Sequence, residues 1–246
     1  MTENTRSILD FIGCEYEIFP GSASQKEILD RFSALTEAGK CAGFSPLVIV
    51  SSDSMAEYLE FFVEDRGGEN TPESVAASRQ AIIAEACKID AKAFLDSWLE
   101  EQLRIYAGEG YDIIGQFSRE ETQNALTLEA VRYEPSEVII AKVPTKNPWE
   151  LAAWLPMGGF NDCPTPAEQV AVYKYWQAKY GAVPAIATFD TWQMTLTTPP
   201  LTEEDAERLA KEQFAFCTDI VTQGTQTILA LASMLKNSKA WYFWWD

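Results

Sequence analysis

The chain has 246 residues, of which 47% are hydrophobic and 12% aromatic, and this composition indicates a folded globular protein rather than a disordered one. Its 19 basic and 37 acidic residues give a formal charge of −18, which disfavours binding to nucleic acid or to an anionic membrane. The absence of histidine excludes Ser-His-Asp and Cys-His catalysis and zinc sites with histidine ligands.

The sequence favours a cytoplasmic location. No apolar run approaches the roughly 20 residues that cross a bilayer, and no signal-peptide pattern follows the first residues. The cysteines are odd in number and widely spread, which fits a reducing compartment: Cys14, Cys41, Cys87, Cys163 and Cys217. The sequence gives no indication of the oligomeric state.

The first half of the chain alternates strands and helices. Residues 15–19 are predicted to form a strand, and the capping box at Ser24 opens a helix that Gly39 should end. The apolar run 46–50 predicts a strand buried on both faces. The helix after it should turn a set of apolar side chains inward: Met55, Tyr58, Leu59, Phe62 and Val63.

Breaks and caps predict the helices that follow. After a break at 67–70, the Thr71-Pro72 cap predicts helices at roughly 72–88 and 90–106. A second capping box at 118–121 predicts another helix, which should end near Leu128.

From residue 137 the elements are closer together. Strands are expected at 138–143, 183–189, 192–197 and 241–245. Helices are expected after Asn147-Pro148, from Thr165 to Gly181 and after Thr202. A second helix after the one at Thr202 is expected to carry Ile220, Ile228, Leu231 and Leu235. The alternation in 192–197 predicts one buried face and one solvent-exposed face.

These elements predict an α/β fold in which a mixed β-sheet is covered by helices and helix exceeds strand. Residues 1–136 should form an N-terminal region that shares the sheet with a C-terminal module, residues 137–246. At strand periodicity, Trp241, Phe243 and Trp245 face one way, and Tyr242, Trp244 and Asp246 face the other. We therefore expect the C-terminal residues to form a buried strand in the interior of the sheet.

Two regions supply candidate site residues near the middle of the C-terminal module. The Asn161-Asp162-Cys163-Pro164 loop precedes a helix whose N-terminus would favour a reactive thiolate at Cys163, although Asn161 and Asp162 could equally hold a turn around a buried Cys163. Trp149 is interpreted either as a core residue or as a surface on which a ligand stacks. No glycine motif for nucleotide phosphates is present.

The remaining candidates lie between the last two predicted helices and at the end of the chain: Glu212, Asp219, Gln223, Trp244 and Asp246. Their polar groups could cap the helix junction. If Glu212 and Asp219 converge with Asp162, an oxygen-ligand Mg²⁺ or Ca²⁺ site becomes feasible.

The C-terminal module contains a series of motifs in a fixed order: Val143-Pro144, Trp149, Gly158-Gly159-Phe160-Asn161-x-Cys163-Pro164, Trp176, Tyr180-Gly181-Ala182, Pro199-Pro200, Ala210-x-Glu212-Gln213, Cys217-x-Asp219-Ile220-Val221-x-Gln223-Gly224 and Trp241-Tyr242-Phe243-Trp244-Trp245-Asp246. By these motifs, residues 138–246 resemble a bacterial family, the domain-of-unknown-function family 4253. The resemblance implies no catalytic role, because the family has no assigned activity, and it supports the C-terminal module as the functional one. Phe160 stands where many members have tryptophan, so a pocket there would differ in ligand preference.

The leading hypothesis is a non-catalytic binding protein of the inhibitor or immunity type. Its acidic surface or C-terminal pocket would engage a basic protein partner, and it would need no cofactor and no metal. The alternative is a metal-assisted hydrolase that uses Glu212, Asp219 and Asp162. A thiol enzyme that uses Cys163 is a third hypothesis.

Overall fold

The structure is a computed structural model, and it describes residues 1–65, 71–118, 122, 124–129, 131 and 136–246. In chain order the elements are α1 (Glu3–Ile12), β1 (Glu15–Phe19), α2 (Gln25–Ala42), β2 (Ser45–Val50), α3 (Asp53–Glu64), α4 (Pro72–Ala86), α5 (Ala91–Glu109), β3 (Val138–Val143), the 3₁₀ helix η1 (Pro148–Glu150), α6 (Leu151–Trp154), α7 (Pro166–Tyr180), β4 (Val183–Ala187), β5 (Thr191–Thr195), α8 (Glu203–Phe216), the π-helix η2 (Ile220–Thr225), α9 (Ile228–Leu235) and β6 (Ala240–Trp244). Helix exceeds strand, as predicted.

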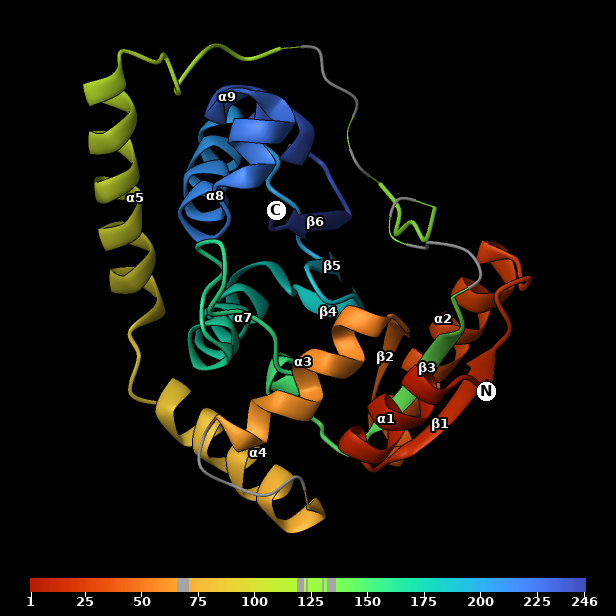
Figure 1. The fold of residues 1–246 in the computed structure, drawn as a ribbon. Coiled ribbons are helices and arrows are strands. Elements are labelled where there is room, and N and C mark those ends of the chain that lie inside the picture. The colour runs from red at the N-terminus through yellow and green to blue at the C-terminus, as the bar shows by residue number, and fades with distance from the viewer. Residues whose placement is uncertain (66–70, 119–121, 123, 130, 132–135) are drawn as a thin grey trace.

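Within the described part of the chain, six strands form one sheet in the order β1-β3-β2-β4-β5-β6 (Figure 1). Strands β2 and β4 pair in parallel, and the other neighbours are antiparallel. The predicted mixed α/β sheet is therefore confirmed. Because β3 pairs with both β1 and β2, strands from residues 1–136 and from residues 137–246 share the sheet, while the boundary between these two regions stays a prediction.

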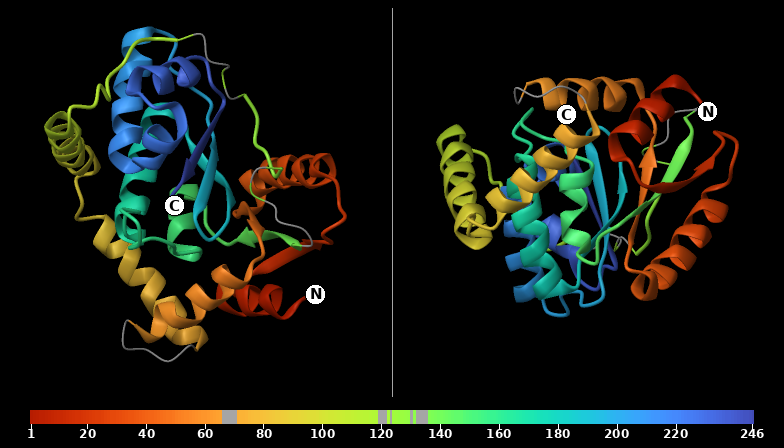
Figure 2. Two further views of the ribbon diagram at one scale, coloured as in Figure 1. Left: turned by 45° about the horizontal axis from the view of Figure 1, so that its top comes forward. Right: turned by 90° about the horizontal axis from the view of Figure 1, so that it is seen from below.

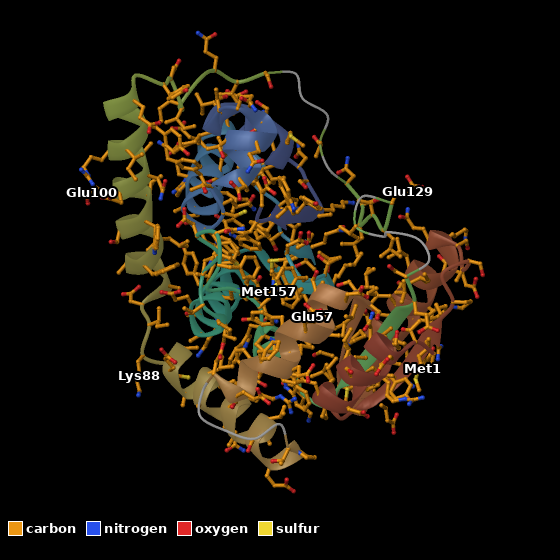
Figure 3. The ribbon with its side chains drawn as sticks, in the orientation of Figure 1. Met1, Glu57, Lys88, Glu100, Glu129 and Met157 are labelled. Carbon is orange, nitrogen blue, oxygen red and sulfur yellow. The ribbon has the colours of Figure 1, made fainter. Side chains whose placement is uncertain are left out.

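The two faces of the sheet are covered unequally (Figure 2). One face packs against α1, α3, α4 and α6 to α9, and Met157, labelled in Figure 3, is fully buried in this layer. The other face packs against α2 and against Leu126, Leu128 and Val131 of the segment between α5 and β3. Helix α5 lies outside the first layer, against α7 and α8. We call the face under α2 the α2 face.

Strand β6 is buried, as predicted, but the expectation that it lies inside the sheet is wrong. Among the described strands it pairs with β5 alone, and it stands at the edge of the six-strand order. Its burial comes from side chains: Trp241, Phe243 and Trp245 are at most 1% exposed beneath α7 and α8. Among the described residues, packing against helices, and not a second neighbouring strand, therefore accounts for the burial of β6.

The solvent-exposed face predicted for β5 is wrong at Gln193, which is fully buried on the α2 face. Its side-chain amide donates to the carbonyl of Thr127 at 2.6 Å and accepts from the Thr127 N–H at 2.9 Å. The Leu128 N–H donates to Gln25 Oε1 at 2.5 Å. These bonds also explain why the helix predicted up to Leu128 is wrong over residues 124–128, because side chains of the sheet and of α2 bind backbone groups there.

Helix α2 continues past Gly39 and ends at Gly43, whose φ of +84° is left-handed. Gly39 is required for another reason, since a Cβ there would lie 2.3 Å from the Phe44 carbonyl oxygen. Helix α5 likewise runs past its predicted end to Glu109. The break predicted at 67–70, the Val63 side chain and residues 119–121 lie outside the described part of the structure.

The described helices include none that is both long enough and apolar enough to span a membrane.

Candidate functional site

The terminal strand divides its aromatic side chains between two environments. On the helix-covered face, the Phe243 ring stacks on Trp176 with centroids 5.4 Å apart, and Trp245 packs edge-on against Phe216 at 5.5 Å. On the α2 face, Tyr242 and Trp244 are only half-buried. Two aromatic rings on the same strand are thus partly exposed on this face.

Asp219 and Asp246 join the terminal strand to the α8–α9 junction. Asp219 Oδ2 accepts from the Asp246 N–H at 3.0 Å, and Asp219 Oδ1 accepts from Gln223 Nε2 at 3.2 Å. The Cys217 thiol donates to the Trp244 carbonyl at 3.0 Å. Four predicted site residues, Asp219, Gln223, Trp244 and Asp246, therefore do converge.

A pocket of about 650 Å³ opens beside this junction. Its lining combines the outer rings of β6 with the turn that precedes α9: Asp219, Ile220, Gln223, Gly224, Thr225, Gln226, Leu231, Met234, Tyr242 and Trp244. The single helix expected here is divided, because η2 is a π-helix and Gln226 takes a left-handed φ of +68° before α9 begins. Such π-helical turns are frequent at functional sites.

A smaller pocket of about 170 Å³ lies at the carboxyl ends of the parallel strands β2 and β4. Its lining is rich in hydroxyl groups and again includes both outer rings: Val50, Ser52, Ser54, Val131, Ser136, Thr188, Phe189, Asp190, Thr191, Tyr242 and Trp244. The Asp190 carboxylate accepts from the hydroxyls of Thr188 at 2.7 Å and Thr191 at 3.1 Å. We call the two pockets, which share Tyr242 and Trp244, the terminal-strand groove.

The smaller pocket occupies a position where open α/β sheets often bind ligands, outside the carboxyl ends of parallel strands. Local sequence patterns do not mark Tyr242 or Asp190 as site residues. The available signal was the buried run 46–50 followed directly by Ser51 and Ser52, which marks the carboxyl end of a parallel strand. Asp190 reaches the pocket because β4 pairs with this strand, and the local sequence does not predict that pairing.

Glu212 does not join this groove. It is 4% exposed and accepts from Tyr175 Oη at 2.8 Å, Trp176 Nε1 at 3.1 Å and Lys179 Nζ at 2.8 Å. Burial opposes the charge of Lys179, but the hydrogen bonds to Glu212, Tyr175 and Tyr180 outweigh it and raise the pKa of Lys179 above its ordinary value. Glu212 therefore ties α8 to α7.

The loop before α7 forms a turn around a buried Cys163, which is one of the two alternatives that its sequence left open. Asn161 and Asp162 are exposed and have left-handed φ values of +45° and +58°, which these residue types tolerate. Cys163 is buried, its N–H donates to the Phe160 carbonyl at 2.7 Å, and burial raises the pKa of its thiol far above the ordinary value. A thiol in this state is protonated and inert, which removes support from the thiol-enzyme hypothesis.

Phe160 and Trp149 lie outside the groove. Phe160 stacks on Phe189 at 5.0 Å, and Phe189 lines the smaller pocket, so Phe160 acts on that pocket through its neighbour. Trp149 is half-buried with Lys174 Nζ 5.0 Å from its ring centre. Trp149 is thus absent from the lining of both pockets.

The three carboxylates of the hydrolase hypothesis do not form a metal site. Burial first, and then the charges of Glu109, Asp219 and Asp162, raise the pKa of Tyr106, so Asp162 and Asp219 lie within electrostatic range of one tyrosine. Nevertheless, among the residues that the structure describes, no three acidic or thiol side chains gather closely enough to hold a metal ion. Glu212 is separately committed to Lys179.

The C-terminal part of the chain matches a known family model. Residues 139–246 match the family model described as "Domain of unknown function (DUF4253)", so the resemblance predicted for this part of the chain is confirmed. The matched region begins in β3 and includes α7, η2 and the terminal strand. Comparison with curated proteins and with solved structures gives no match.

Proposed function

We propose that this protein is a non-catalytic, cytoplasmic binding protein of the inhibitor or immunity type, and that its terminal-strand groove holds a basic segment of a partner protein. The observation that carries the proposal is the pairing of two half-buried rings, Tyr242 and Trp244, with the carboxylates of Asp219 and Asp190 on their two sides. Aromatic faces and carboxylates are the two groups that attract guanidinium and ammonium ions.

The charge of the groove supports a cationic ligand. Neither Lys nor Arg occurs among the described residues that line its two pockets. Asp219 accepts one hydrogen bond on each carboxylate oxygen, which leaves further acceptor capacity for a donor from a ligand. A net charge of −18 would also steer a basic partner toward the protein at long range.

The shape of the groove supports a segment rather than a globular surface. The larger pocket, about 650 Å³, falls within the range of roughly 300–1,000 Å³ that is usual for ligand sites. Its wall at η2 is a turn with a glycine, Gly224, where a bound chain could approach the backbone closely.

Calorimetric titration with a short capped peptide of alternating Arg and Ser tests the proposal. We expect binding that weakens as salt rises, and a loss of affinity of about tenfold in Asp219→Asn and in Trp244→Ala. Glu204→Gln is the matched control, because it removes the same charge from a side chain that is 90% exposed in the first turn of α8. Equal weakening by Asp219→Asn and Glu204→Gln would show only non-specific attraction and would contradict the groove.

A further inference from the structure

A separate pocket lies at the opposite end of the parallel strands, where β2 and β4 begin. It has a volume of about 460 Å³, within the usual range of roughly 300–1,000 Å³ for small-molecule sites. Apolar side chains from α2, the α2–β2 connection, both strands and η1 form much of its wall: Phe32, Phe44, Pro46, Val183 and Pro148. It shares no residue with the terminal-strand groove.

Polar side chains also contribute to the lining of this pocket. In the described structure, no hydrogen bond or ion pair engages the side chains of Lys146, Gln177, Thr195 or Thr197, all of which line the pocket. The stem of Lys146 passes close to Gly43, where an added Cβ would lie 3.2 Å from Lys146 Cε. An apolar body with a few converging polar groups is the usual arrangement of a small-molecule site.

The charge of the lining distinguishes this pocket from the groove. Its charged residues are Lys40, Lys146 and Glu37, and Lys40 pairs with Glu37 at 2.6 Å. One positive charge, that of Lys146, therefore remains uncompensated within a chain of net charge −18. A single ammonium group suits a singly charged anion, so a carboxylate matches it better than a phosphate dianion does.

We propose that this pocket binds a small organic carboxylate whose ring packs against Phe32, Phe44 and Val183 while its carboxylate meets Lys146. The amide of Gln177 and the hydroxyls of Thr195 and Thr197 supply further donors at the pocket wall. The proposal stands independently of the basic partner assigned to the terminal-strand groove.

Titration of the full chain with naphthalene-2-carboxylate, followed by calorimetry, tests it. We expect saturable binding that weakens about tenfold for the neutral naphthalene-2-carboxamide, and about tenfold for the carboxylate in Lys146→Met. Lys88→Met is the matched control, because Lys88 is exposed at the end of α4, outside the pocket (Figure 3). Asp219→Asn should leave the affinity unchanged, which separates this site from the groove.

Thermal melting of each variant verifies that it is folded before titration. Absence of saturable binding to the folded wild-type protein would overturn the proposal. Equal affinity for the carboxylate and the carboxamide would also overturn it. So would equal affinity in Lys146→Met and Lys88→Met, because Lys146 would then contribute nothing to binding of the anion.

Discussion

The side-chain amide of Gln193 forms two hydrogen bonds with the backbone of Thr127, donating to its carbonyl at 2.6 Å and accepting from its N–H at 2.9 Å. A buried side chain of β5 thus forms both a donor and an acceptor bond with the backbone of the segment between α5 and β3, as the backbone of a neighbouring strand would. Glu129, labelled in Figure 3, directly follows Leu128, whose N–H donates to Gln25 in the first turn of α2. This contact holds the segment against the α2 face, at a position between the two proposed sites.

Replacing Gln193 by Ala should destabilise the protein by about 2–4 kcal/mol, because it leaves the N–H and carbonyl of Thr127 without partners. Urea unfolding measures the loss. Gln223→Ala is the control, since Gln223 is an exposed amide with one bond to Asp219, and we expect it to change stability by less than about 0.5 kcal/mol. Equal stability of the two variants would mean that the Thr127 contact does not hold the segment.

The Glu212–Lys179 pair should behave as a coupled unit. We expect Glu212→Leu to cost about 3 kcal/mol, because it leaves Tyr175, Trp176 and Lys179 without their acceptor, and Lys179→Met to cost about 2 kcal/mol. The double variant should lose less than the sum of these costs. Strictly additive losses in urea unfolding would contradict the coupling.

The same pair should depend on pH in a defined direction. The folded-state pKa of Lys179 is raised above the unfolded value of about 10.4, so the contribution of its charge is fully present below that pH. It is lost as pH rises through the raised value. The stability difference between wild type and Lys179→Met should therefore stay constant from neutral pH to about 10 and shrink above it.

The cysteines should divide into fast and slow groups toward a thiol reagent. Cys41 and Cys87 are exposed, whereas Cys163 and Cys217 are buried, and burial raises the pKa of the Cys217 thiol to about 12. At mildly alkaline pH we expect rapid modification of Cys41 and Cys87 only. A Cys41→Ser/Cys87→Ser variant provides the control, and rapid labelling of Cys163 in that folded variant would restore the thiol-enzyme hypothesis.

Neighbouring tryptophans of the terminal strand should differ in their contribution to stability. Trp245 is 1% exposed, so Trp245→Ala should lower the free energy of unfolding by about 3–5 kcal/mol. Trp244 is half-buried, so Trp244→Ala should lower it by less than half of that amount. Removal of residues 241–246 should unfold the protein, since it deletes three buried rings. A truncated chain that retains its cooperative thermal transition would show that the tail serves binding and not the core.

Local sequence patterns predicted the elements whose signals are local. The capping box at Thr165 is present with both of its hydrogen bonds, and the period-two pattern placed Trp241 and Phe243 on the buried face. The wholly apolar run 46–50 predicts a strand buried on both faces, and the structure buries each of its residues.

The failures arise where tertiary contacts override local preference. A capping box predicted a helix up to Leu128, but Gln193 and Gln25 bind the backbone there instead. The edge position of β6 depends on strand order, which periodicity does not encode. Asp219 and Trp244 can be predicted as candidates from the local sequence, but Asp190 cannot. Asp190 reaches the groove through the pairing of β2 with β4, which periodicity does not encode either.

The most direct measurement of the proposed basic-segment site is the indole N–H resonance of Trp244 in the ¹⁵N-labelled protein, assigned by its disappearance in Trp244→Phe. During titration with the Arg-Ser peptide, we expect this resonance to shift in proportion to saturation, while those of the buried Trp241 and Trp245 remain in place. A Trp244 resonance that does not move while the peptide binds elsewhere would contradict the assignment of the terminal-strand groove as the binding site.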